Sequence, residues 1–104
     1  NSWVYYNLGL LFLEQRNWQQ ALDNLEASLI GNLKPSWIEV WAHIKRGNAY
    51  DAKGERQRAT AEYNKALQTG IDYDNAQAVA KKYLATPYDP KASQTAEALP
   101  PGDN

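Results

Sequence analysis

The chain repeats part of its own residue pattern at a spacing of 38 positions, and this internal repeat limits the possible folds more than any other feature. Aligned on itself at that offset, the chain keeps the size class of six small or apolar positions. The matched pairs are Gly9 and Gly47, Phe12 and Tyr50, Ala21 and Ala59, Leu25 and Tyr63, Ser28 and Ala66, and Leu29 and Leu67.

Within each unit these positions follow helical spacing. Gly9 and Phe12 lie three residues apart, and Ala21, Leu25 and Ser28 continue at steps of four and three. We therefore predict two antiparallel helix pairs. Small residues would let the two helices of a pair approach, Gly9 facing Ala21 and Gly47 facing Ala59, and larger residues would fill the space beside them.

Capping and breaking residues divide the chain into five helices and no strand. We predict that Ser2 and Asn17 cap the first two helices, that Ser36 and Glu39 form a capping box, and that Asp74 with Gln77 repeats this pattern. Gly31, Gly54 and Gly70 interrupt the chain. The predicted helices are residues 3–15, 18–30, 37–53, 56–69 and about 74–86.

The motif Tyr5-Tyr6-Asn7-Leu8-Gly9-Leu10-Leu11-Phe12, followed by Ala21, Leu25 and Ser28, resembles a tetratricopeptide repeat. The second unit, from Gly47 through Gly54, Ala59 and Tyr63, is similar in the same way. The resemblance covers residues 3–70 and implies an all-α, right-handed α-solenoid of two stacked helix-turn-helix repeats. The family period is ~34 residues, so we place the additional residues in the connection 31–37. Arg16 stands where the second unit has Gly54.

We expect one domain at residues 1–88, with a first repeat at about 2–32, a second at about 36–70 and a capping helix at about 74–86. Ala76, Val79, Ala80 and Tyr83 give that helix an apolar face, which would cover the open end of the stack. Residues 89–104 are small, polar and proline-containing, and we expect a disordered tail or linker there.

Composition excludes several classes of function. The net charge is −1, from 11 basic and 12 acidic residues, which argues against nucleic acid as a partner. There is no Cys, so thiol chemistry and cysteine-bound zinc are excluded. His43 has only Glu39 at helical spacing, which is too little for a metal site. We therefore expect a structural histidine, no metal, no cofactor and no enzyme activity.

The chain also contains no run of about 18 apolar residues of the kind that crosses a membrane. We expect a soluble module without a targeting segment in these residues, and its compartment is left open. Because the chain contains no Met and opens with Asn1-Ser2, we expect it to be part of a longer protein.

Aromatic residues give the strongest indication of function. In tetratricopeptide repeats the first helix of each pair lines the concave surface, and this face is unusually apolar in the first unit here. Trp and Tyr on an exposed surface are typical anchors for a partner. The resemblance places the candidate groove at Trp3, Tyr6, Asn7, Leu10, Leu13, Trp41, Ile44, Lys45, Asn48 and Asp51.

We accordingly predict a non-catalytic module that binds a peptide or a partner protein through this groove. One alternative is that an upstream segment covers Trp3, Tyr6 and Leu10. A second is that the same face drives homo-oligomerisation. A third is an accessory segment of a larger bacterial enzyme or secreted protein, because the run Ala80-Lys81-Lys82-Tyr83-Leu84 resembles the C-terminal ends of longer bacterial proteins.

Overall fold

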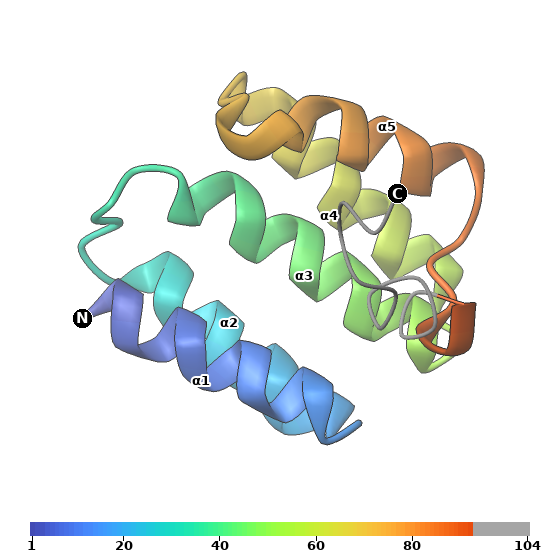
Figure 1. The fold of residues 1–104 in the computed structure, drawn as a ribbon, viewed down its shortest axis with the longest axis horizontal. Helices are drawn as coiled ribbons and strands as arrows, with labels where there is room; N and C mark the ends of the chain where they lie inside the picture. The colour runs from blue at the N-terminus through green and yellow to red at the C-terminus, as the bar shows by residue number, and fades with distance from the viewer. Residues whose placement is uncertain (93–104) are drawn as a thin grey trace, which may run out of the picture.

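The computed structural model describes residues 1–92, and within them the chain forms helices and no strand. The predicted all-α class is therefore confirmed. The helices pack in chain order, with α3 between the α1–α2 pair and the α4–α5 layer (Figure 1). Their bounds are α1 Ser2–Glu14, α2 Trp18–Ile30, α3 Ile38–Ala52, α4 Arg56–Thr69, the short 3-10 helix η1 Tyr73–Asn75, and α5 Ala76–Ala85.

The two helix pairs close through the same kind of turn. Asn17 N–H donates to Phe12 O at 2.9 Å, and 38 residues later Glu55 N–H donates to Tyr50 O at 2.8 Å. The residue before each donor has left-handed backbone, with φ of 59° at Arg16 and 78° at Gly54. The two turns are thus equivalent residue by residue, although only the second has the glycine that this conformation favours.

Each pair is also joined by an equivalent close contact at a glycine. A Cβ built on Gly9 would lie 2.6 Å from Leu25 Cγ, and a Cβ on Gly47 would collide with the ring of Tyr63. The atoms nearest to these two built Cβ positions therefore belong to Leu25 and Tyr63. The side chain of Leu25 or Tyr63 fills the space that the missing Cβ leaves. A glycine and a large apolar residue therefore recur together in both units.

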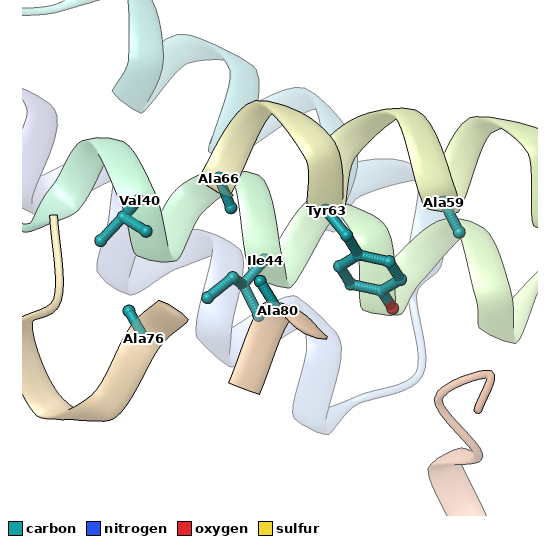
Figure 2. Close-up of a cluster of buried hydrophobic side chains, with 7 residues drawn as sticks. All are labelled: Val40, Ile44, Ala59, Tyr63, Ala66, Ala76 and Ala80. Atoms are coloured by element: carbon teal, nitrogen blue, oxygen red, sulfur yellow. The ribbon is translucent and has the colours of Figure 1, made fainter. Parts of the chain in front are cut away.

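Two buried clusters form the core, and α3 contributes to both. Tyr6, Leu25, Ile38 and Ala42 join α1, α2 and α3. Figure 2 shows the second cluster, in which side chains of α3 and α4 meet Ala76 and Ala80 of α5. The predicted fifth helix therefore does cover the last pair. The members of this second cluster are Val40, Ile44, Ala59, Tyr63, Ala66, Ala76 and Ala80.

Three of the predicted caps are wrong. Asn1, not Ser2, caps α1, since its Oδ1 accepts from Val4 N–H at 3.1 Å. Ser36 and Glu39 form no capping box, because a backbone turn begins α3 with Ile38 N–H donating to Pro35 O. The predicted cap Asp74 has a φ of 55° within η1.

Other helix ends agree with the sequence. Asn17 Oδ1 accepts from Gln20 N–H, and α4 covers the predicted residues up to the left-handed Gly70. Asp72, rather than Asp74, accepts from Gln77 N–H, at 3.0 Å. Of the predicted tail, residues 93–104 lie outside the described part of the chain.

Candidate functional site

A groove of about 430 Å³ lies between α1, the N-terminal half of α3 and η1. Ligand pockets in proteins commonly measure ~300–1,000 Å³, so this groove is large enough for one or two side chains of a bound peptide. Half of its lining residues are aromatic, and the full lining consists of Tyr6, Asn7, Leu10, Trp37, Trp41, Lys45, Tyr73 and Asp74.

The aromatic walls are fixed against one another. The rings of Tyr6 and Trp37 meet edge to face at 5.4 Å, and Trp37 stacks on Tyr73 with ring centroids 5.4 Å apart. Trp41 Nε1–H donates to Tyr73 O at 3.0 Å. The groove has walls on α1, α3 and η1. Because these contacts hold η1 against α3, the η1 wall is in place without a ligand.

Hydrogen bonds from the start of α5 also hold η1 in place. Gln77 Nε2 donates to Ala66 O at 3.2 Å and to Ile71 O at 2.8 Å, which ties the segment before η1 to the end of α4. A ligand therefore does not have to order this wall, and a preformed wall lowers the entropic cost of binding.

Polar groups lie at the rim of the groove. Asn7 is exposed on α1, and its Nδ2 donates to Trp3 O at 2.7 Å. Lys45 Nζ lies 5.7 Å from the ring centroid of Trp41, and Asp74 is exposed on η1. Burial, together with the negative charge of Asp74, raises the pKa of Tyr6, so its phenol stays neutral. The rim thus offers the amide of Asn7, the cation of Lys45 and the anion of Asp74 around the aromatic walls.

Half of the predicted groove residues meet at this site. Tyr6, Asn7, Leu10, Trp41 and Lys45 all line it. Tyr6 is only 6% exposed and belongs to the core cluster as well, so its ring serves as a wall and not as a projecting anchor. Leu10 and Trp41 are half-buried.

The other five predicted residues lie elsewhere. Trp3 is 52% exposed and does not line the groove, while Leu13 packs on the core cluster of α1 and α2. Ile44 is fully buried against Val40 and Tyr63 (Figure 2), so it does not line the groove as predicted. The reason is that α5 covers this part of α3, which the helical period of α3 alone does not reveal.

Asn48 and Asp51 belong to a buried polar network instead of the groove. Asn48 Nδ2 donates to Tyr63 Oη at 3.0 Å, and that hydroxyl donates to Asp51 Oδ2 at 2.8 Å. Asp51 also accepts from Arg56 at 3.0 Å and from Tyr88 N–H at 3.0 Å. Burial and the hydrogen bond to Asp51 raise the pKa of Tyr63.

This network ties the chain after α5 back to α3. Arg56 Nη2 donates to Tyr83 O and Leu84 O at 2.8 and 2.9 Å, which satisfies carbonyls at the end of α5. The carboxylate of Asp51, with its side chain 2% exposed, therefore joins α3 to α4 and to the segment after α5.

His43 pairs with Glu62 of α4, and not with Glu39 as the sequence spacing allowed. His43 Nδ1 lies 2.9 Å from Glu62 Oε1, and Arg46 Nε lies 3.4 Å from the same oxygen. Burial acts to raise the pKa of Glu62, but the hydrogen bond with His43 and the charge of Arg46 outweigh it, so this pKa is lowered. Arg46 Nη1 also donates to Leu22 O at 2.8 Å, which links α3 to α2.

Sequence reasoning missed three lining residues: Trp37, Tyr73 and Asp74. Trp37 could have been found, because it lies four residues before Trp41 and eight before Lys45, on one helical stripe. Tyr73 and Asp74 lie in the three-residue η1 between α4 and α5, which is too short for periodicity to indicate which way a side chain points.

Within residues 1–92 the structure places no three metal-binding side chains together and contains no helix long and apolar enough to cross a membrane. Comparison with protein-family models, with curated proteins and with solved structures gives no match.

Proposed function

We propose that this chain is a tetratricopeptide-type module, with its helix pairs stacked as a short solenoid, that binds a peptide segment of a partner protein in the groove between α1, α3 and η1. The observation that carries this proposal is the preformed aromatic groove itself. Four aromatic rings are fixed by mutual contacts and still line an accessible space of about 430 Å³.

The equivalence of the two helix pairs supports the repeat assignment. The turn hydrogen bonds, the left-handed turn residues and the glycine contacts all recur at the spacing of 38 residues. Stacked helical repeats commonly present an extended concave surface for a partner. Here that surface would correspond to the faces of α1 and α3 that line the groove.

The lining indicates what the groove favours. Its aromatic walls suit one large apolar or aromatic side chain, since aromatic pairs add about 0.5–1.5 kcal/mol beyond the area they bury. Asn7, Lys45 and Asp74 at the rim can bond the backbone and polar side chains beside that anchor. A short peptide with one apolar anchor between polar residues fits this arrangement.

The proposal is tested by selecting peptides from a random display library against the full chain. Asn7→Arg places a long charged side chain at the groove rim, and the matched control Leu8→Arg places the same side chain at an exposed position on another face of α1. We expect Asn7→Arg to weaken the selected peptides by about tenfold or more, the effect of ~1.4 kcal/mol, and Leu8→Arg to leave them unchanged.

Two outcomes would contradict the proposal. The library could yield no peptide that binds reproducibly, or the selected peptides could be lost on Leu8→Arg and kept on Asn7→Arg. Circular dichroism of both variants shows whether each remains folded, so loss of binding is separated from loss of structure.

A further inference from the structure

The outer face of α1 is an apolar surface that no described residue covers. Val4, Leu8 and Leu11 are 46%, 37% and 47% exposed and follow steps of four and three, which places them on one stripe of the helix. Tyr6 and Leu10 line the groove on another side of α1, so this stripe is separate from the binding site proposed above. α1 is thus apolar nearly all round, with Glu14 as its one charged residue, and such helices are normally buried.

The internal repeat indicates which kind of element packs on this stripe. At the spacing of 38 residues, the exposed Val4, Leu8 and Leu11 correspond to Ala42, Arg46 and Ala49 of α3. Both alanines are fully buried, and Ala42 packs in the cluster that contains Leu25 of α2. Arg46 donates to Leu22 O of α2. In the second unit, therefore, the equivalent face is where the preceding helix pair packs.

We propose that the outer face of α1 docks the second helix of a further helix pair of the same polypeptide, seated on α1 as α2 is seated on α3. The contact would continue the interface already formed between the two described pairs. Val4 and Leu11 are larger than the alanines they correspond to, so the docking helix needs smaller side chains opposite them than α2 offers to α3.

A second copy of this chain cannot seat its α2 or α4 on this stripe. The face of α2 that would dock already packs on α3 of its own chain, and the equivalent side of α4 is covered by α5. The outer surface of α2 that remains carries polar residues such as Gln19, Asp23 and Glu26. A contact that repeats the seating of α2 on α3 therefore needs a further second helix. Within the described chain, consecutive pairs follow one another through a short connection, 31–37.

The test is a fusion that supplies such a helix. Residues 1–38 are duplicated ahead of the full chain, so that the added copy of α2 precedes α1 by the same distance as α2 precedes α3. A second fusion carries Leu22→Ala in the added copy, which shortens a side chain at the position whose carbonyl accepts from Arg46 in the α2–α3 contact. Hydrogen exchange of the α1 amides is compared with that of the unfused chain by mass spectrometry.

We expect α1 to exchange roughly tenfold more slowly in at least one fusion, because a covered helix opens less often. Leu8→Glu in the original α1 should abolish that gain while leaving the exchange of α4 unchanged. Equal exchange of α1 in the unfused chain and in both fusions would overturn the proposal. An unfused chain that sediments as a dimer and becomes monomeric with Leu8→Glu would also overturn it, because a second copy would then pack on this face. Neither outcome bears on peptide binding in the groove.

Discussion

Replacing Gly47 by alanine tests whether the glycine contacts hold each helix pair together. The new Cβ would collide with the ring of Tyr63, which is fully buried in the second core cluster. That ring cannot move freely, because its hydroxyl is hydrogen-bonded to Asn48 at 3.0 Å and to Asp51 at 2.8 Å. The backbone or the ring must therefore shift.

The magnitude follows from three opposing contributions. Overpacking a core costs about 1–3 kcal/mol, and giving up one of the two hydrogen bonds of Tyr63 costs about 0.5–1.5 kcal/mol. Alanine in place of glycine inside a helix recovers about 1 kcal/mol. We therefore expect Gly47→Ala to lower the free energy of unfolding by about 0.5–3.5 kcal/mol, which for a domain of this size lowers Tm by about 4–8 °C per kcal/mol.

Urea unfolding followed by tryptophan fluorescence and circular dichroism measures this loss. Ala61→Gly, at an exposed position of α4, gives the helix-propensity contribution alone, for which we expect a loss of about 1 kcal/mol. Tyr63→Phe frees the ring from its hydrogen bonds, so Gly47→Ala should cost less in that background. A Gly47→Ala protein as stable as the parent would refute the reasoning, because the contact would then be no constraint.

Three further predictions concern stability. The pKa of Glu62 is lowered from its ordinary value of 4.5. Ionised Glu62 therefore stabilises the fold above that pH, and this stabilisation is lost as the pH falls through the folded pKa. In urea titrations, the stability of Glu62→Gln should fall less than that of the parent between pH 6 and pH 3. Ala21→Leu, at a fully buried position, should cost about 1–3 kcal/mol, whereas Ala61→Leu should be nearly neutral, and equal urea midpoints would contradict this. Arg16→Gly should stabilise the chain by up to ~1 kcal/mol, because Arg16 has the left-handed φ of 59° that Gly54 supplies in the second turn; a lower Tm would show that the Arg16 side chain matters more than its backbone.

The sequence predicted the helices well because their ends are marked by strong local signals. Asn17 and Gly70 act through their own backbone or side chain within one turn of the chain, so their effect does not depend on the rest of the fold. The Ser36–Glu39 box did not form because Ile38 N–H donates to Pro35 O and Glu39 N–H donates to Ser36 O in a backbone turn. Local signals are reliable where nothing else competes for the same hydrogen bonds.

The groove was predicted only in part, for a different reason. Helical periodicity places Tyr6, Leu10 and Trp41 on the correct stripes, but it does not say where α5 and η1 pack on α3. Ile44 is covered by one of these elements, and Trp37 is stacked by the other. The sequence places Asp51 in the groove, whereas its carboxylate binds Arg56 and Tyr63, partners that come from α4.

The most direct test of the account is to observe the four tryptophans while a selected peptide is added. Each indole N–H gives one signal in a ¹⁵N–¹H spectrum, assigned through Trp→Phe variants of the full chain. Trp37 and Trp41 line the groove, whereas Trp18 lies outside it at the start of α2. We predict that the signals of Trp37 and Trp41 shift in a saturable manner while that of Trp18 stays in place. Saturable binding that moves Trp18 and leaves Trp37 and Trp41 unchanged would contradict the account.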